Sequence, residues 1–287
     1  MLAIYKKELR SYFTSMIGYV FIAFFLVIIG LYYYFQNLMS GYARFEYTLV
    51  GVAFIAVLLV PILTMRVMAE ENKQKTDQLL LTSPLSAASI VMGKFFALLT
   101  VYASVMAVTC TYPLILSIYG KVNFASAYAA IFGFTLLGGA YIAVGQYISS
   151  LTESQVVAAV VSFILFLFTI LMEGFSKMVP SSNQETFKVF IIILALICVV
   201  LYLMMRSIAF SGLVFIVVGG ALAIAHSIHP TWFDGLLPKI AGWLSVLTRF
   251  NSFSIGIFDL TSIVYYISII FIFTFLTTQV IKKKRWS

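Results

Sequence analysis

Charged side chains gather in one stretch of this chain, residues 68–86, which is a long polar interruption between two apolar segments that could each span a bilayer. Three leucines follow the charges, and Pro84 then disfavours helix at Ser83, so we expect a short helix to end there. Ser86 is placed to cap the next helix. The pattern predicts an amphipathic helix on one membrane face that offers leucines to a partner. Its charges are Glu70, Glu71, Lys73, Lys75 and Asp77, and its leucines are Leu79, Leu80 and Leu81.

Motifs for catalysis are missing from the sequence. Gly93-Lys94 is followed by Phe95 and lacks the upstream glycine of a phosphate-binding loop. There is no H-E-x-x-H or G-x-S-x-G motif. Acidic residues are nearly missing from the apolar segments, which argues against a proton or sodium relay. We therefore expect that the chain is not an enzyme and that another subunit supplies the energy for any transport.

Residues that bind metals are not grouped either. His226 and His229 have no Cys, Asp or Glu beside them at ligand spacing, so we interpret them as interfacial histidines. Cys110 and Cys198 fall in apolar segments, where a thiol usually acts as a small buried hydrophobic group. The sequence predicts no metal site and no cofactor in this chain.

The composition is that of an integral membrane protein. Of the 287 residues, 62% are hydrophobic and only 10% are charged, and the mean hydropathy is +1.07. The net charge of +8 does not indicate nucleic-acid binding, because the basic residues lie in short clusters beside apolar segments. The first apolar segment is too long for the core of a cleavable signal.

Eight segments reach the length of about 20 apolar residues that a membrane-spanning helix needs. The split between the sixth and seventh, at Met205-Arg206-Ser207, is tight, and the two could instead form a hairpin that dips partway through the membrane. The segments predict an all-α membrane protein. They are residues 17–36, 46–66, 91–119, 126–150, 155–174, 187–205, 208–227 and 262–281.

The positions of Lys and Arg orient these segments, because cytoplasmic loops carry an excess of both. With the N-terminus in the cytoplasm, 12 of the 18 fall on that side, and an even number of spans returns the C-terminus to it. We expect a multi-pass protein of the cell (plasma) inner membrane with both termini cytoplasmic. The 12 are Lys6, Lys7, Arg10, Arg66, Lys73, Lys75, Lys94, Arg206, Lys282, Lys283, Lys284 and Arg285.

Two segments outside the spans are predicted to lie at the membrane surface. Residues 1–16 have an amphipathic helical pattern, typical of an interfacial helix or of a simple positive anchor. Residues 228–261 are too apolar for a free loop and too charged for a span, which favours interfacial or re-entrant helices. In the first segment the apolar side is Leu2, Tyr5, Leu9, Tyr12, Phe13 and Met16, and the polar side is Lys6, Lys7, Glu8 and Arg10.

Three internal features have both a structural and a functional interpretation. Pro61 predicts a kink in the second span, used for packing or as a hinge. The small residues at 138, 139, 143 and 145 would let another helix approach closely. In the turn 149–155, Thr152 or Ser154 can cap the next helix, and Thr152 with Glu153 could also form a second contact with a cytoplasmic partner.

Residues 65–71 (MRVMAEE), 76–84 (TDQLLLTSP) and Gly93-Lys94 resemble the first cytoplasmic loop of ABC-2 type permeases. Further stretches resemble the gliding-motility-type branch of that family, in order along the chain. They are residues 6–13 with Gly18-Tyr19, 140–145, 149–155, Arg249-Phe250, Phe253, Gly256 and Asp259. Residues 187–227 match least and look like a hairpin added to a six-span core. Two positions depart from the family pattern, since Lys75 stands where a glycine is common and Gln78 where an acid is common.

The resemblance implies a single permease domain over residues 1–287, with a cytoplasmic coupling loop at 67–90 and an outer re-entrant segment at 228–261. It implies that the coupling loop docks on a separate cytoplasmic ATPase that binds ATP and Mg²⁺. The implied coupling residues are Glu70, Glu71, Lys73, Thr76, Asp77, Leu79, Leu80, Leu81, Thr82 and Pro84. The implied outer gate is Trp232, Trp243, Arg249, Phe253 and Asp259.

The implied partners are this ATPase, a second permease copy as a homodimer or a similar chain, and a companion membrane protein with a large extracytoplasmic domain. The bilayer surrounds the complex, and nucleic acid is not a partner. Two alternatives stay open on the sequence, a self-sufficient secondary carrier and a non-transporting membrane scaffold. A secondary carrier would need ionisable residues inside the membrane, whereas a scaffold would tolerate substitutions in the outer segment.

Overall fold

In the computed structural model of the protein, residues 1–76, 85–178, 182–205, 208–228 and 233–286 are described, and they form helices joined by turns, with no strand among them. Their contacts divide the chain into two units. Unit 1 contains Met1–Ile170 and Val246–Ser287, and unit 2 contains Leu171–Ser245. The all-α prediction is confirmed for the described residues.

Six helices of the described chain are long and apolar enough to cross a membrane. They correspond to six of the eight predicted spans. The other two predicted spans fall on α10 (Asn183–Met205) and α11 (Ile208–Ile228), and the count of eight stays a prediction. The six are α2 (Met16–Tyr33) with the π-helix η1 (Tyr34–Met39), α3 (Glu46–Thr64) with α4 (Arg66–Gln74), α6 (Ala87–Thr109) with α7 (Tyr112–Tyr119), α8 (Phe124–Leu151), α9 (Gln155–Met178) and α14 (Leu260–Trp286).

Helix α8 is the centre of unit 1 and packs against α3, α4, α6, α14 and the short helix α13 (Val246–Ser254). Its glycines explain how so many helices reach it. A Cβ at Gly138 would lie 2.3 Å from the Tyr102 ring, and one at Gly145 would lie 2.3 Å from Thr64 Oγ1. The predicted close approach of helices at these small residues is therefore confirmed.

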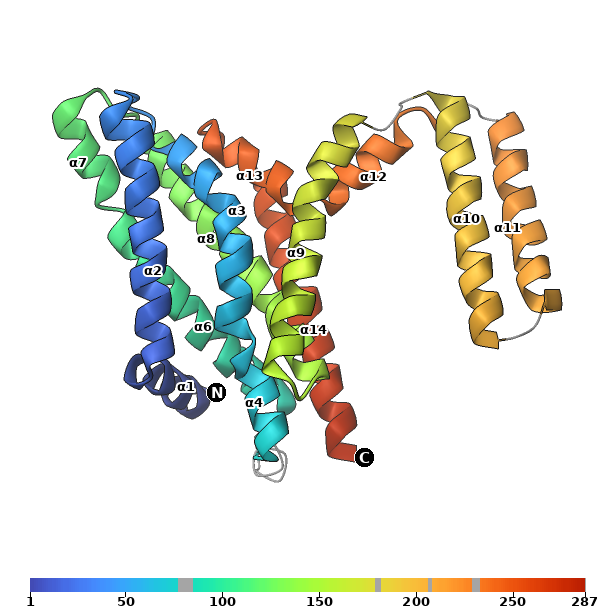
Figure 1. Ribbon diagram of the computed structural model, residues 1–287, viewed down its shortest axis with the longest axis horizontal. Coiled ribbons are helices and arrows are strands. Elements are labelled where there is room, and N and C mark those ends of the chain that lie inside the picture. Colours follow the sequence, from blue (N-terminus) through green and yellow to red (C-terminus); the bar gives the residue numbers. More distant parts are fainter. Residues whose placement is uncertain (77–84, 179–181, 206–207, 229–232, 287) are drawn as a thin grey trace. The chain divides into compact units, whose positions relative to one another are not determined.

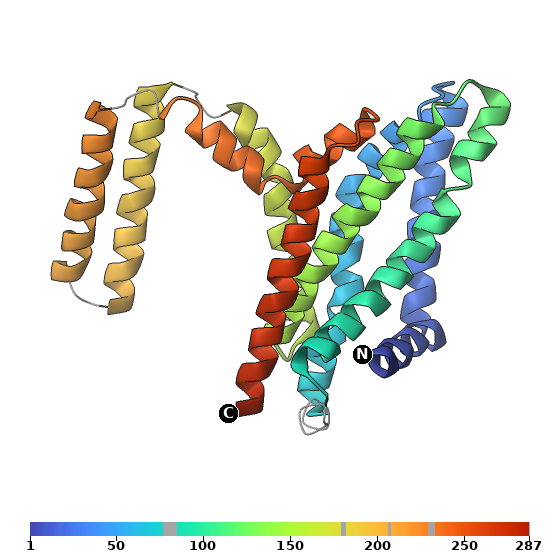
Figure 2. The ribbon, with the colours of Figure 1, turned by 180° about the vertical axis from the view of Figure 1, so that it is seen from behind.

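Helix α1 (Leu2–Thr14) lies at the same end of unit 1 as α4 and the C-terminal end of α14, whereas α7 and η1 lie at the opposite end (Figure 1 and Figure 2). Its buried residues are Ile4, Glu8 and Tyr12. The prediction that Glu8 belongs to the exposed polar side is wrong. Glu8 is turned inward because a buried cation on α6 attracts it, as described below.

Unit 2 contains the C-terminal end of α9, the paired helices α10 and α11, and α12 (Leu236–Leu244). Aromatic rings hold its described parts together, since the His226 ring stacks on Phe187 at 4.6 Å and meets Phe233 at 5.4 Å. The predicted outer segment 228–261 spans α12, α13 and the start of α14. Re-entry of these helices into a membrane stays a prediction.

Candidate functional site

A break separates α3 from α4 at Met65, and a serine from α8 occupies it. The Ser149 hydroxyl accepts hydrogen bonds from the backbone N–H groups of Met68 (3.2 Å) and Ala69 (3.1 Å), and it donates one to Met65 O (3.0 Å). A hydroxyl has one proton and two lone pairs, so all three bonds can form together. A side chain that enters the backbone ladder is a recognised cause of helix kinks. The break between α3 and α4 therefore lies at Met65, about one helical turn beyond Pro61.

Lys94 of α6 holds α4 from another side. Its side chain is 0% exposed, and Nζ lies 2.6 Å from Glu71 Oε2 and 3.4 Å from Glu8 Oε1. The same ammonium donates to Val67 O at 2.7 Å. A buried charge is costly unless it is paired and hydrogen-bonded, and Lys94 has two hydrogen bonds to α4 and ion pairs with two carboxylates. Lys94 thus connects α6 with both α1 and α4.

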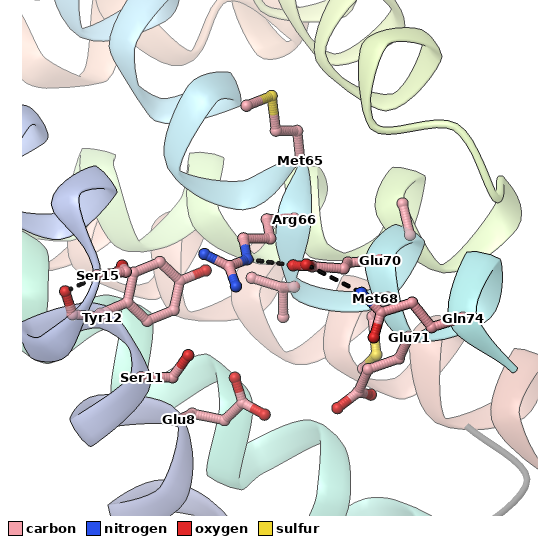
Figure 3. A network of polar contacts seen from close by, with 12 residues as sticks. Glu8, Ser11, Tyr12, Ser15, Met65, Arg66, Met68, Glu70, Glu71 and Gln74 are labelled. Carbon is pink, nitrogen blue, oxygen red and sulfur yellow. Dashed lines mark hydrogen bonds and ion pairs between the residues drawn. The ribbon is translucent and has the colours of Figure 1, made fainter. Parts of the chain in front are cut away.

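The carboxylates of this cluster face a pocket of about 440 Å³ between α1 and α4. Figure 3 shows Glu8 and Tyr12 of α1 turned toward Arg66, Glu70 and Glu71 of α4. Arg66 pairs with Glu70, which also accepts a hydrogen bond of 3.3 Å from Gln74 Nε2. The pocket is lined by acids and bases alike.

The burial and the charges around this pocket shift the pKa values of two groups on α1. Burial lowers the pKa of the Lys7 ammonium, but the charges of Glu71 and Glu8 outweigh that effect and hold the pKa above its usual value of 10.5. Lys7 lies 3.3 Å from Glu71 Oε1 and 3.7 Å from Glu8 Oε1. Burial also raises the pKa of the Tyr12 hydroxyl, which donates to Leu63 O at 3.2 Å. Tyr12 therefore stays a neutral donor at physiological pH and ties α1 to the end of α3.

The turn between α8 and α9 lies beside α4. Asn72 Nδ2 donates to Thr152 O at 3.1 Å. Lys284 of α14 donates to Ser150 O at 3.0 Å, so the basic end of α14 reaches the same turn. The Ser154 hydroxyl accepts from Val157 N at 3.4 Å, which confirms the predicted cap of α9. The structure thus brings the predicted second contact, Thr152 with the exposed Glu153, next to α4.

The predicted coupling residues divide into two groups. Glu70, Glu71, Lys73 and Thr76 are described. The two glutamates and Thr76 line the pocket, and Lys73 and Thr76 are exposed. Ser86 accepts from Ser89 N at 3.2 Å, as predicted for the cap of α6. The other predicted coupling residues lie outside the described residues. They are Asp77, Leu79, Leu80, Leu81, Thr82 and Pro84.

Lys75 ends α4 in the left-handed conformation, with φ 55° and ψ 19°. Thr76 N then donates to Glu71 O at 3.1 Å, which satisfies a carbonyl of the last turn. Glycine is the residue that adopts this conformation without strain. The geometry therefore gives a physical reason for the glycine that the family pattern favours at this position.

Three residues of the site were named in the sequence analysis but were not predicted as site residues: Glu8, Lys94 and Ser149. Lys94 had a usable signal, because a lysine two turns inside an apolar helix needs a partner. Glu8 lies four residues from both Ile4 and Tyr12, on the face that proves to be buried. Ser149 had no local signal, since its role depends on a helix break far away in the sequence.

The predicted outer-gate residues lie in both units. In unit 1, Phe253 is fully buried against Gly133 of α8, and the Arg249 guanidinium lies 5.6 Å from the centroid of the Tyr265 ring. Asp259 precedes α14 and caps it through Thr261 N (2.9 Å) and Ser262 Oγ (2.7 Å). Trp243 belongs to unit 2 and is 72% exposed, whereas Trp232 lies outside the described residues. A gate at these residues stays a prediction.

Metal-binding groups of three or more His, Cys, Asp or Glu side chains do not occur in the described part of the chain. Comparison with known families gives one match. Residues 2–191 match the model of the ABC-2 family transporter proteins. None of the curated proteins matches the chain. The matched range contains α1, α4, Lys94 and the turn before α9, and therefore the whole polar cluster around α4 except the end of α14.

Proposed function

Since the chain belongs to the ABC-2 family of transporter proteins, we propose that it is the permease subunit of an ATP-driven transporter and that α4, with the residues following it, is the element that couples it to a cytoplasmic ATPase. In this proposal the separate ATPase subunit binds ATP and Mg²⁺ and performs hydrolysis. The permease converts the resulting movement into export or into work on the cell envelope.

The observation that carries this proposal is the set of hydrogen bonds and ion pairs that join α4 to the neighbouring helices. Ser149 joins α4 to α8, Lys94 joins it to α6 and α1, and Asn72 joins it to the turn before α9. Force applied to the end of α4 would therefore reach several helices of unit 1. Rigid elements joined at defined contacts are the usual means of transmitting such movement.

The exposed side chains near the end of α4 supply a docking surface in this proposal. Lys73, Lys75 and Thr76 are exposed on α4 and the turn after it, and Glu153 is exposed on the neighbouring turn. Charged groups of this kind set the register and the rate of association, whereas apolar contacts supply most of the affinity. We assign the apolar contacts to Leu79, Leu80 and Leu81, on the sequence pattern alone.

This proposal also fixes the membrane orientation. An ATPase that meets α4 in the cytoplasm requires both termini there, because α1 and the C-terminal end of α14 lie at the same end of unit 1 as α4 (Figure 1). The protein would then be a multi-pass protein of the inner membrane. A second permease copy, a gliding-motility-type companion with a large extracytoplasmic domain and an outer gate at 228–261 are further parts of the proposal that rest on the resemblance.

The test is a pull-down from native membranes under gentle solubilisation with an ATP analogue, followed by mass spectrometry. The wild-type protein should retain a subunit with a phosphate-binding loop, and Leu80→Asp should lose it while still inserting into the membrane. Tyr119→Asp is the matched control, because Tyr119 is 74% exposed at the opposite end of unit 1. Equal recovery of the ATPase with Leu80→Asp would refute the docking role.

A further inference from the structure

The Lys94 ammonium makes more contacts than a single ion pair between two helices. Its ammonium has one acceptor on the α4 backbone, Val67 O at 2.7 Å, and one on an α4 side chain, Glu71 Oε2 at 2.6 Å. A second carboxylate, Glu8 on α1, forms an ion pair with the ammonium at 3.4 Å. The ammonium thus has two hydrogen bonds to α4 and an ion pair with α1, so its partners come from two helices other than its own.

We propose that Lys94 is a positioning residue that joins α1 and α4 to α6 as one rigid body and so sets the direction in which α4 meets the ATPase. This proposal rests on the proposed function, because it concerns the geometry of the coupling element. In this proposal α1 helps to transmit the movement of the ATPase from α4 to the rest of unit 1, in addition to contacting the membrane surface.

The break at Met65 is the reason that α4 needs a second attachment. Helix α4 has nine residues, and an isolated helix of that length is marginal in water. Ser149 fixes only its first turn, at Met68 and Ala69. Lys94 adds a contact at Val67 and another at Glu71, one turn further along. Asn72 also makes a contact at this level, with Thr152 O at 3.1 Å in the turn after α8. Lys94 therefore adds the attachment of α4 to α6 and α1, and contacts with several helices define the axis of α4 more narrowly than contacts with α8 and its turn alone.

The residue before Lys94 explains how α1 comes close enough to take part. A Cβ at Gly93 would lie 3.1 Å from Ile4 Cβ and 3.1 Å from Met1 O, both on or beside α1. A larger residue there would push α1 away from α6 and move Glu8 away from the ammonium. Gly93 and Lys94 therefore act together, since the glycine provides the approach and the lysine provides the bond.

The two carboxylates that pair with Lys94 are partly exposed, so Lys94 can be replaced without leaving charges that unfold the protein. The side chains of Glu8 and Glu71 are 11% and 16% exposed and line the pocket between α1 and α4. Water can reach them there if Lys94 is replaced. We expect Lys94→Met to fold for this reason, and the double variant Lys94→Met with Glu71→Gln removes one of the unpaired charges as a second version of the test.

The experiment measures the distance between spin labels on α1 and α4 in nanodiscs, with the ATPase bound and with the permease alone. The labels replace the exposed Lys6 and Gln74 in a background carrying Cys110→Ala and Cys198→Ala. Lys73 is kept because it belongs to the proposed docking surface. We expect one narrow distance distribution in the otherwise unmodified protein, with or without an ATP analogue. Both Lys94 variants should lose this narrow distribution, and they should lose permease-stimulated ATP hydrolysis while still binding the ATPase.

Lys7→Met is the matched control, because Lys7 meets the same two carboxylates but its side chain is 60% exposed. An exposed pair contributes little, so this variant should keep the narrow distribution. An unchanged distribution in both Lys94 variants, or equal broadening in Lys7→Met, would overturn the proposal. If the unmodified permease binds no ATPase, the proposed function fails, but the label distance in the permease alone still decides the role of Lys94.

Discussion

At the scale of single residues, the roles of two lysines in and around α4 are understood only from their geometry. Lys75 takes a left-handed conformation that ends α4, and Lys94 is a cation without exposed surface. From the sequence, both were assigned to the cytoplasmic side, Lys75 as a departure from the family pattern and Lys94 as part of the Gly93-Lys94 resemblance, without these structural roles. Position in a helix, rather than residue type, gives each its role.

The left-handed conformation of Lys75 predicts that Lys75→Gly makes the end of α4 more stable, by about 1 kcal/mol, since a non-glycine residue is strained there. Hydrogen exchange of the α4 amides would slow accordingly. Lys73→Gly is the opposite control, because Lys73 is inside the helix and its replacement should cost about 1 kcal/mol. Faster exchange in Lys75→Gly would contradict the assigned cap.

Asp259 provides a prediction about pH. Hydrogen bonds from Ser262 and Thr261 hold the pKa of its carboxyl below the ordinary value of 3.8. A lowered pKa in the folded state means that the stabilisation is complete above the unfolded pKa and is lost as the pH falls through the folded one. The first turn of α14 should therefore lose protection from hydrogen exchange in acid below about pH 4.

Asp259→Asn is the control for this effect, because an asparagine oxygen caps a helix about as well as aspartate and does not titrate in this range. The first turn of α14 should then keep the same protection across the acid range. Identical acid sensitivity in the wild type and in Asp259→Asn would show that another group is responsible.

At the scale of elements, the lengths of the long helices followed from the sequence, but the break within one of them did not. Runs of apolar residues predicted six spans that the structure contains, because a spanning helix needs a long apolar segment wherever it packs. The break at Met65 is bridged by Ser149, which is 84 residues away in the sequence. No local signal in the sequence marks that position. A kink at Pro61, which lies inside α3, stays a prediction.

Ser149→Ala should weaken the junction between α3 and α4. The backbone groups at the break would lose a hydrogen-bond partner in a buried place, which costs about 1–3 kcal/mol. The thermal unfolding temperature in nanodiscs should fall. Ser150→Ala is the matched control, since among the described residues the Ser150 hydroxyl bonds only to Tyr147 O of its own helix, and its loss should matter less. Equal shifts in the two variants would argue against the inserted hydroxyl.

At the scale of the whole molecule, the distribution of basic residues and the structure agree on one point. Lys6, Lys73 and Lys284, all assigned to one side from the sequence, lie on elements at the same end of unit 1 (Figure 2). The family match covers residues 2–191, which contain α1, α4, Lys94 and the turn before α9. Docking chemistry could not be derived further from the sequence, because the shape of a partner surface is not encoded in this chain.

The central claim is that α4 and the turn before α9 meet a cytoplasmic ATPase. The most direct measurement is site-specific photo-crosslinking in native membranes, with the photoreactive residue placed at Lys73, at Glu153 or at Tyr119. We predict cross-links to a subunit with a phosphate-binding loop from Lys73 and Glu153 and none from Tyr119. Cross-links to that subunit from Tyr119 alone, or from none of the three positions while the ATPase copurifies, would contradict the claim.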